Sequence, residues 1–265
     1  MHPPPSLSEL GQDLLEVSPA RTAFALSLPF ALLTAYFALA AGGVWWAALV
    51  CPILISFFTY GSVSHDLVHR NLKLPTWLNE SLLTIIELLA LRSGHAYRTS
   101  HLNHHAHFPH DDDIEGAAAR MTIPQALREG MTIQYRIWIW AVRKDSPHRQ
   151  LILIEGLATL AIILAAFALL PWTVSPTIYV VMMIVGSWIN PLVTVVIPHN
   201  ASATERLRQT RLFRGKVLSC LALEHLYHLE HHLYPQVPHQ NWPKLANRLD
   251  PYFEKSHLAP IKLLF

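Results

Sequence analysis

Hydrophobic residues are concentrated in four long runs, each long enough to cross a bilayer as a single helix. A helix needs about 20 apolar residues to span the hydrocarbon core of a membrane. The four runs cover residues 22–41, 44–63, 151–170 and 177–198. A fifth run, SLLTIIELLAL at residues 81–91, is too short to span, and we expect it to be interfacial or re-entrant. The pattern predicts an all-α membrane protein with four transmembrane helices.

The positions of the basic residues predict which side of the membrane the polar segments occupy. The two connections within the pairs of spans, residues 42–43 and 171–176, contain no Lys or Arg. All basic residues then fall on the opposite side, together with both termini, and the positive-inside rule makes that side cytoplasmic. We therefore expect a cytoplasmic N-terminal tail, a single membrane domain and, within that domain, a cytoplasmic helical cap. These parts comprise residues 1–21, residues 22–265, and residues 64–150 with 199–265, respectively.

Composition supports a membrane protein and argues against several other classes. Charged residues make up 14% of the chain, compared with about 25% in a typical soluble domain. The net charge of +2 is too balanced for a nucleic-acid-binding surface. Cys51 and Cys220 are far apart and form no CxxC pair, which argues against a disulfide framework or a cysteine-ligated zinc site. The outlying number is the histidine count, which is 17.

Histidines recur at helical spacing in three short segments of the cap. The first is HDLVH, in which His65 and His69 lie four residues apart and so share one helical face. The other two read HxxHH and comprise His101, His104 and His105, then His228, His231 and His232. Eight imidazoles exceed the roughly four ligands of a zinc site, so the spacing predicts a dinuclear metal site in the cap. Imidazole suits iron, zinc and copper alike, so the spacing leaves the metal open.

Several other metal and redox chemistries are not supported by the sequence. Neither HExxH nor HxxEH, the motifs of zinc proteases, occurs. A haem between the spans would need histidines inside them, and the middle of each span has none. The chain also has no CxxCH and no four-cysteine cluster, and no GxGxxG follows a strand. Electrons for a redox reaction must therefore come from a separate protein.

The segments HDLVH, HLNHH and HLEHHLYPQVP occur in this order beside two pairs of spans, over roughly residues 45–250. In this the chain resembles the membrane fatty-acid desaturase and hydroxylase superfamily. The resemblance implies two iron ions that activate O2, a lipid substrate and a donor of the cytochrome b5, ferredoxin or rubredoxin type. It also implies a ninth ligand, His199, at the cytoplasmic end of the fourth span. The implied ligands are His65, His69, His101, His104, His105, His199, His228, His231 and His232.

Acidic residues and one further histidine are candidates for orienting the ligands, because a metal-bound imidazole usually donates its other N–H to a carboxylate or a carbonyl. The candidates are Asp66, Asp111, His225 and Glu230. His225 precedes the third segment by three residues. Its alternative is to be an ordinary polar residue of the helix that orients no ligand. Asp112 or Asp113 has the alternative role of capping a helix over residues 114–120.

Three further features of the spans and the cap lead to expectations. Residues 131–144 mix aromatic and basic side chains, which predicts an interfacial helix with aromatic rings at headgroup depth. The basic stretch over residues 206–216 is explained either by topology or by docking of an acidic electron carrier. Glu155, just inside the third span, is expected either to snorkel to the interface or to have a polar partner.

The sequence leaves three functions open. The tail HHLYPQVP followed by NWPKL resembles acyl-lipid desaturases, and we favour fatty acyl desaturation. The short chain, the stretch VVIPHN and the run DDD after the second segment resemble β-carotene ketolases and hydroxylases, although HQNW at residues 239–242 replaces their usual tryptophan pair. The third alternative is a non-enzymatic membrane metal-binding protein, for which repeated HxxHH spacing would not be needed.

Overall fold

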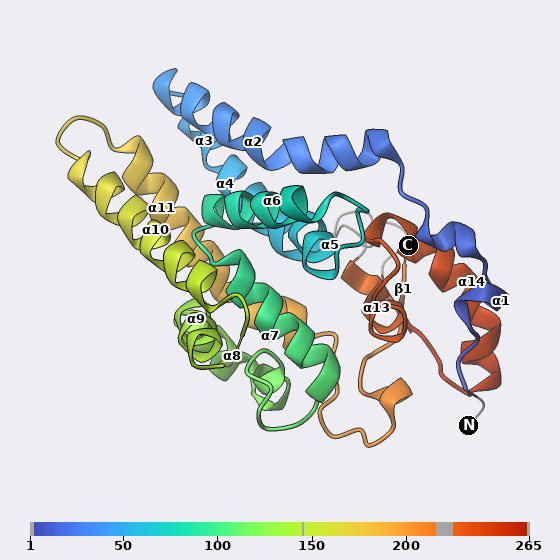
Figure 1. Cartoon of the computed structure of the whole chain (residues 1–265). Helices are drawn as coiled ribbons and strands as arrows, with labels where there is room; N and C mark the ends of the chain where they lie inside the picture. Colours follow the sequence, from blue (N-terminus) through green and yellow to red (C-terminus); the bar gives the residue numbers. More distant parts are fainter. Residues whose placement is uncertain (1–2, 145, 216–224, 264–265) are drawn as a thin grey trace.

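The computed structural model describes residues 3–144, 146–215 and 225–263, and it is mostly helical (Figure 1). Four helices in this part of the chain are long and apolar enough to cross a membrane, which confirms the predicted number of spans. They cover Gln12–Ala41, Trp45–His69, Arg149–Ala168 and Ser175–Val196. Large apolar side chains on them, such as Leu157 and Leu164, are exposed, as expected for surfaces that face lipid. The cytoplasmic orientation stays a prediction.

The first two spans form a helical hairpin. α2 (Pro19–Ala41) begins after Ser18, whose hydroxyl accepts a hydrogen bond from the backbone N–H of Arg21 at 3.5 Å. It ends at Ala41 and is followed by Gly42 and Gly43, the second of which has a φ of 74° that glycine adopts without steric cost. The chain then returns through α3 (Trp45–Ala48), α4 (Val50–Phe58), a π-helical segment (Thr59–Val63) and α5 (Ser64–His69).

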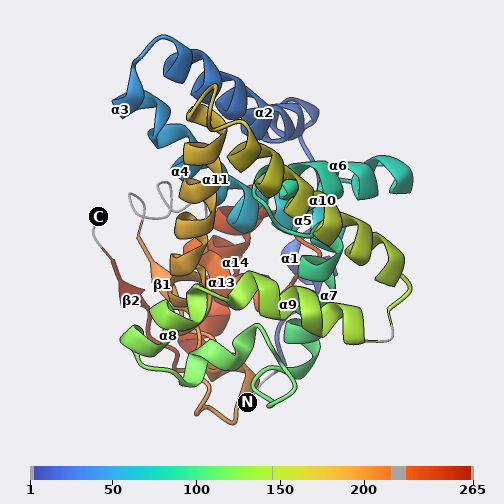
Figure 2. The same ribbon diagram turned by 90° about the vertical axis from the view of Figure 1, so that its left-hand side faces the viewer.

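The third and fourth spans pack beside the first pair. They consist of α10 (Arg149–Ala168), then α11 (Ser175–Gly186), a 3-10 turn (Ser187–Ile189) and a second π-helical segment (Leu192–Val196). The rings of Tyr36 on α2 and Tyr179 on α11 lie 5.2 Å apart, and the Tyr36 hydroxyl donates to the carbonyl of Ser175 at 2.6 Å. A buried phenol needs such an acceptor, so these contacts hold the two pairs together. Figures 1 and 2 show α2, α4, α10 and α11 at one end of the molecule.

Helices between the two pairs of spans begin the cap. α6 (Thr76–Leu89) contains the fifth apolar run and is not among the candidate spans. It is followed by α7 (Gly94–His107), a 3-10 helix (Gly116–Arg120), α8 (Ile123–Gly130) and α9 (Ile133–Arg143). α9 lies where the interfacial helix was predicted, whereas residues 114–120 form only the short 3-10 helix.

Glu155 joins this part of the cap to the third span. Its carboxylate accepts hydrogen bonds from the hydroxyl groups of Thr84 and Ser93, at 2.5 and 2.6 Å, and from the backbone N–H of His95 at 3.0 Å. The residue is buried, so its charge is stabilised by these donors and not by water. Glu155 was expected either to snorkel to the interface or to have a polar partner, and the structure shows polar partners.

The C-terminal part of the chain completes the cap and packs against the N-terminal residues. Its elements are 3-10 turns (Arg206–Arg208, His225–Tyr227 and His239–Asn241), α13 (His228–Leu233), α14 (Trp242–Lys255), and the parallel strands β1 (Phe213–Arg214) and β2 (Ile261–Lys262). α1 (Leu7–Leu10) and the following 3-10 turn (Gln12–Leu15) lie against α14, where Leu10 and Leu14 join its apolar cluster. Asp13 also pairs with Arg248 at 2.8 Å. The N-terminal segment is therefore packed in place, which the sequence did not indicate.

Candidate metal centre

All nine histidines implied as ligands lie together, although they come from four separate parts of the chain. Two lie on α5, three on α7, one just after the second π-helical segment, and three on α13. They form two groups, and within each group the potential ligand atoms lie within 4.8 Å of one another. The first group consists of His65, His69, His101, His105 and His231, and the second consists of His104, His199, His228 and His232.

Local helix geometry divides each HxxHH segment between the two groups. On α7, residues four apart, His101 and His105, belong to the first group, and His104 belongs to the second. Residues four apart lie nearly in line along a helix, whereas the residue at i+3 is displaced to one side. Both π-helical segments end two or three residues before a ligand, at Val63 before His65 and at Val196 before His199. Such wider turns, which are frequent at functional sites, redirect the side chains that follow.

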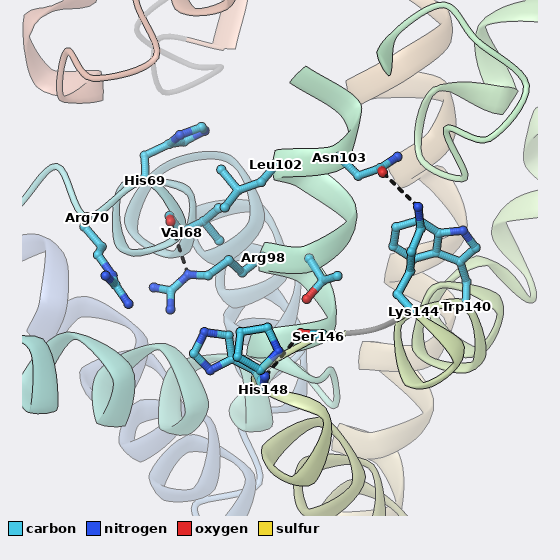
Figure 3. Close-up of a pocket in the computed structure, with 12 residues that line it drawn as sticks. Val68, His69, Arg70, Arg98, Leu102, Asn103, Trp140, Lys144, Ser146 and His148 are labelled. Carbon is cyan, nitrogen blue, oxygen red and sulfur yellow. Dashed lines mark hydrogen bonds between the residues drawn. The ribbon is translucent and has the colours of Figure 1, made fainter. Parts of the chain in front are cut away.

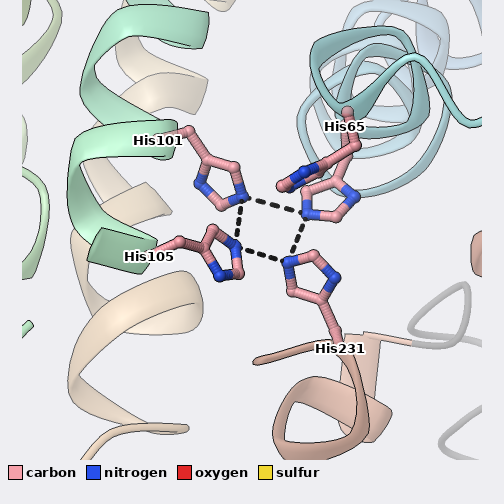
Figure 4. Close-up of side chains that lie close together, drawn as sticks. His65, His101, His105 and His231 are labelled. Carbon is pink, nitrogen blue, oxygen red and sulfur yellow. Dashed lines mark hydrogen bonds between the residues drawn. The ribbon is translucent and has the colours of Figure 1, made fainter. Parts of the chain in front are cut away.

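The first group forms a closed ring of short contacts between Nε2 atoms (Figure 4). The separations are 3.1 Å for His65 and His101, 3.1 Å for His101 and His105, 2.7 Å for His105 and His231, and 3.0 Å for His231 and His65. Nitrogens at right angles around a metal, with bonds of about 2.1 Å, would be about 3.0 Å apart. The ring therefore has the spacing of ligands around one ion. Nε2 of His69 has no hydrogen-bond partner among the described residues.

The second group has the same spacing and adjoins the first. Nε2 of His199 lies 3.0 Å from that of His104, 3.2 Å from that of His232 and 3.3 Å from that of His228. The rings of His105 and His232, one from each group, have centroids only 4.4 Å apart. The two groups thus have the arrangement expected of a dinuclear site.

Buried carboxylates fix the orientation of one histidine in each group. Nδ1 of His101 lies 2.9 Å from Oε1 of Glu115, and Nδ1 of His104 lies 2.7 Å from Oδ2 of Asp113. Both carboxylates are buried. A carboxylate accepts hydrogen bonds, so Nδ1 of each histidine carries a proton, and in the neutral form of the ring the lone pair is on Nε2. Both histidines are therefore set up to bind a metal through Nε2.

The contact between His104 and His199 shows most clearly that these residues fit a cation. Nδ1 of His199 donates to the carbonyl oxygen of Val195 at 3.0 Å, which leaves a lone pair on its Nε2 as well. When both rings are neutral, the Nε2 atoms of His104 and His199 face each other at 3.0 Å with no proton between them. Two lone pairs at this distance repel each other, and a cation bound by both removes the repulsion.

Burial favours the neutral form, which binds metals, for most of the candidate ligand imidazoles outside the spans. It lowers the pKa well below its usual value for four of them, namely His105, His199, His231 and His232. For His104, burial also lowers the pKa, but the hydrogen bond to Asp113 and the charges of Glu115 and Asp113 outweigh it and raise the pKa. A proton therefore competes with a metal for His104 at higher pH than for those four.

Two of the residues proposed to orient the ligands lie elsewhere in the structure. Asp66 is buried, but its carboxylate accepts hydrogen bonds from the backbone N–H and Nδ1 of His239, with the first at 3.0 Å. It therefore fixes the chain just before α14. The side chain of Asp111 is 99% exposed and pairs with Arg120 at 3.1 Å. Neither contact involves a ligand histidine.

The other two candidates are Glu230 and His225. Oε1 of Glu230 lies 2.6 Å from Nη1 of Arg214, an ion pair that holds α13 against β1. Burial raises the pKa of Glu230 to about 7 even though the arginine opposes the shift. The side chain of His225 lies outside the described residues.

Sequence reasoning only partly identified the residues that do support the ligands. Asp113 holds His104 with Oδ2, and its Oδ1 accepts from the backbone N–H of Gly116 at 2.9 Å, although the N-cap residue of the short 3-10 helix is Glu115 and not Asp113. Glu115 was not a candidate, because it follows its partner His101 by 14 residues and only the turn after α7 brings it back. A search for carboxylates 9 to 14 residues after a histidine of the segment would have found both.

A polar cavity of about 280 Å³ reaches both groups. His105 and His232 line it, together with Arg206, Gln209 and Thr210. It therefore exposes one histidine of each group to small molecules or to a surface partner. Figure 1 shows the elements concerned, with α13 beside α7.

Comparison with known proteins identifies the family. A search of curated proteins finds no match for this chain. A family model described as fatty acid desaturase matches residues 43–263, well over half of the chain, and confirms the resemblance seen in the histidine segments. The protein therefore belongs to the fatty acid desaturase family, which makes it a membrane oxidoreductase that acts on lipid.

Proposed function

We propose that the protein uses two iron ions and O2 to oxidise a lipid C–H bond, with fatty acyl desaturation as the reaction. The observation that carries this proposal is the convergence of nine imidazoles into two adjoining groups. Iron is among the metals that imidazole suits, and the family is one of di-iron enzymes. A metal buffer would not need ligands fixed by buried carboxylates, so this alternative is not supported.

The chain's own contribution is to hold, orient and shield the ligands. Bound iron would supply O2 activation and hydrogen abstraction from an unactivated carbon, with two electrons from outside. Glu115 and Asp113 keep His101 and His104 in one tautomer, so each Nε2 is available without rearrangement. His104 is 1% exposed and His231 is fully buried, so the protein shields these two histidines from bulk water, whereas His105 and His232 line the polar cavity.

An apolar cavity among the membrane helices supports a lipid substrate. It has a volume of about 380 Å³ and lies between α9, α10 and α11, which Figure 2 shows side by side. Its lining includes Leu157, Leu160, Ile163 and Met183. Ligand cavities commonly have volumes of about 300 to 1,000 Å³ and mostly apolar walls. A segment of an acyl chain fits a site of this size and chemistry.

The electron donor is proposed to be a separate protein. The polar cavity at His105 and His232 supports this, because it brings the surface close to both groups. Of the basic stretch considered for docking, only Arg206 lines this cavity. Arg208 pairs with Glu205 at 3.0 Å, Arg214 pairs with Glu230, and Lys216 lies outside the described residues. Docking of an acidic carrier therefore rests on Arg206 and Arg211, which donate to backbone carbonyls and have no acidic partner among the described residues.

The test is mass spectrometry of the lipids and pigments of a host that makes both fatty acids and β-carotene. Wild-type protein is compared with the His231→Ala variant, each expressed with a broad-range electron donor and confirmed to be present in the membrane. New unsaturated acyl chains with the wild type alone are the expected result. Oxygenated carotenoid would replace the acyl assignment by a ketolase or hydroxylase. The absence of both products from cells with iron-loaded protein would overturn both named substrates.

A further inference from the structure

Three polar residues that the proposed di-iron centre does not use come together beside the start of the third span. They are Glu80 on α6, His95 on α7 and His148, the residue before α10. Each offers one potential ligand atom, and these atoms all lie within 4.8 Å of one another. His148 also lines a cavity of about 500 Å³, together with Arg70 and Arg98 (Figure 3). A small ion can therefore approach the cluster from this cavity.

His95 is held in the way that a metal-binding histidine usually is. It is fully buried, and its Nδ1 lies 2.7 Å from Oε1 of Glu155, which is buried on α10. The backbone N–H of His95 donates to the other oxygen of the same carboxylate at 3.0 Å. A carboxylate behind Nδ1 fixes the ring with Nε2 pointing away from it. The same arrangement holds His101 and His104 in the two histidine groups.

Nε2 of His95 faces a second carboxylate. It lies 2.9 Å from Oε2 of Glu80. A neutral imidazole has one N–H, so it can donate to only one of its two carboxylate neighbours. The other contact then places a nitrogen lone pair against a carboxylate oxygen. A second proton on the ring, or a metal cation bound by both atoms, removes that repulsion.

Two arginines share Glu80 with the histidine. Nη1 of Arg98 contacts Oε2 of Glu80, and Nη2 of Arg70 lies 3.1 Å from Oε1. The carboxylates of Glu80 and Glu155 together balance the charge of these two guanidinium groups. A carboxylate has about four lone-pair positions, and carboxylates that bind metals normally accept hydrogen bonds as well. Glu80 can therefore keep its arginines and still offer a lone pair to an ion.

His148 supplies the third potential ligand. Its ring centroid lies 4.9 Å from that of His95, and among the described residues its ring nitrogens have no hydrogen-bond partner. Asp145, three residues earlier, lies outside the described residues. His148 is half-buried in the connection before α10, so its ring can adjust to an ion without disturbing the helix.

We propose that Glu80, His95 and His148 bind one divalent transition-metal ion of the zinc type, separate from the di-iron centre. Two imidazoles and one carboxylate are a donor set that holds zinc in proteins, with a fourth position left open. Each histidine group has four or five imidazoles instead, so the third site suits a different metal. Zinc binds nitrogen and oxygen ligands more tightly than Fe2+ does, so this site takes zinc in preference to iron. The ion would join α6 and α7 to the start of the third span.

The experiment counts zinc bound to the metal-free full chain in detergent micelles. The protein is dialysed to equilibrium against buffered free zinc, set where the wild type is just saturated, and zinc per chain is measured by inductively coupled plasma mass spectrometry. Zinc also fills the two histidine groups under these conditions, so the third site is measured as a difference between proteins.

The test variant is His148→Ala, which removes a ligand whose ring makes no hydrogen bond among the described residues. His110→Ala is the matched control, because His110 is exposed and belongs to none of the three clusters. Both metal-free variants should melt at the temperature of the metal-free wild type, since neither substitution removes a buried contact. Thermal unfolding followed by circular dichroism checks this.

We expect His110→Ala to bind as much zinc as the wild type and His148→Ala to bind one equivalent less. Loss of a ligand should weaken the third site by more than the roughly 10- to 100-fold that loss of an outer partner costs. Equal zinc content in all three proteins, or an equal loss in both variants, would overturn the site. A failure of the di-iron proposal would instead change the metal content that all three proteins share and leave their difference intact.

Discussion

In both histidine groups Nε2 atoms face one another, but different hydrogen bonds hold the rings of the two groups in place. In the first group, His101 is held by Glu115, and the other hydrogen bonds of that carboxylate come from side chains. The hydroxyl of Ser100 donates to it at 3.3 Å and that of Tyr60 at 3.5 Å. Both distances are long for hydrogen bonds between oxygen atoms. The carboxylate of the first group is therefore held mainly by the histidine that it orients.

In the second group, the support comes from the main chain. Asp113 holds His104 with one oxygen and accepts from the backbone N–H of Gly116 with the other, at 2.9 Å. His199 donates to the carbonyl of Val195 at 3.0 Å. The second group is thus fixed by backbone geometry, whereas the first depends on a carboxylate with weak side-chain contacts. The comparison predicts unequal responses when each support is removed.

The largest effect is expected when one ligand is removed from either group. His231→Ala takes a ligand from the first group and His104→Ala takes one from the second. Because a dinuclear reaction needs both ions, each variant should abolish oxidation of lipid while still inserting in the membrane. Product formation per amount of membrane-inserted protein measures this. Full activity in either variant would show that its group is not part of the reacting centre.

The next largest effect should separate the two carboxylates. In Asp113→Asn, the amide has only one acceptor oxygen for the two donors, His104 and the backbone N–H of Gly116. In Glu115→Gln, the amide oxygen still accepts from His101, and the new amide N–H groups face a hydroxyl. Loss of such a support costs about 10- to 100-fold in metal affinity. We expect the loss of iron affinity to be near 100-fold for Asp113→Asn and near tenfold for Glu115→Gln, measured by iron titration of the apo-protein. The reverse order would contradict the comparison.

The pH dependence of metal binding should also differ between the groups. The pKa of His104 is raised, so this ligand is protonated at a higher pH than His105 and His231 of the first group, whose pKa values are lowered. Below the pKa of a ligand, each pH unit costs up to about tenfold in affinity, because the metal must displace a proton.

Two variants that each lack one histidine separate the pH dependence of iron binding in one group from that in the other. His231→Ala disrupts the first group and leaves the second, whereas His104→Ala does the opposite. Iron affinity should therefore fall more steeply from pH 8 to pH 6 in His231→Ala than in His104→Ala. Parallel curves would show that the proton on His104 does not distinguish the groups.

The smallest effect is expected from the outermost contact of the first group. Tyr60→Phe removes a hydroxyl that lies 3.5 Å from Glu115, a distance at which a hydrogen bond contributes little. Activity should fall by less than about twofold, while the ring still packs against Tyr97 at 4.6 Å between centroids. Steady-state rates at saturating lipid measure this. A loss of activity as large as that of Glu115→Gln in the same rate assay would mean that the Tyr60 hydroxyl holds the carboxylate of Glu115.

The parts of the molecule with a strong periodic signal could be predicted from the sequence. Long apolar runs identified the four spans, because the length of a spanning helix is set by the thickness of the bilayer. Helical spacing identified the histidine segments, because i, i+3 and i+4 share a face whatever the tertiary structure. These signals are local, so they need no knowledge of how the helices pack.

Features that depend on chain reversal or on helix packing could not be predicted. Helical spacing separates His104 from His101 and His105, but which histidines of α5 and α13 join each of these sets follows from helix packing, which spacing alone does not contain. Glu115 reaches His101 only because the chain turns back after α7. Leu10 and Leu14 looked like part of a tail, since their apolar partners on α14 lie more than 200 residues later.

The two groups are proposed to bind one iron each, and the iron content of the purified protein tests this most directly. Inductively coupled plasma mass spectrometry of wild type, His231→Ala and His104→Ala gives this content per chain. We expect two irons in the wild type and one in each variant, one for each intact group. A single iron in the wild type, or the same iron content in all three proteins, would contradict it.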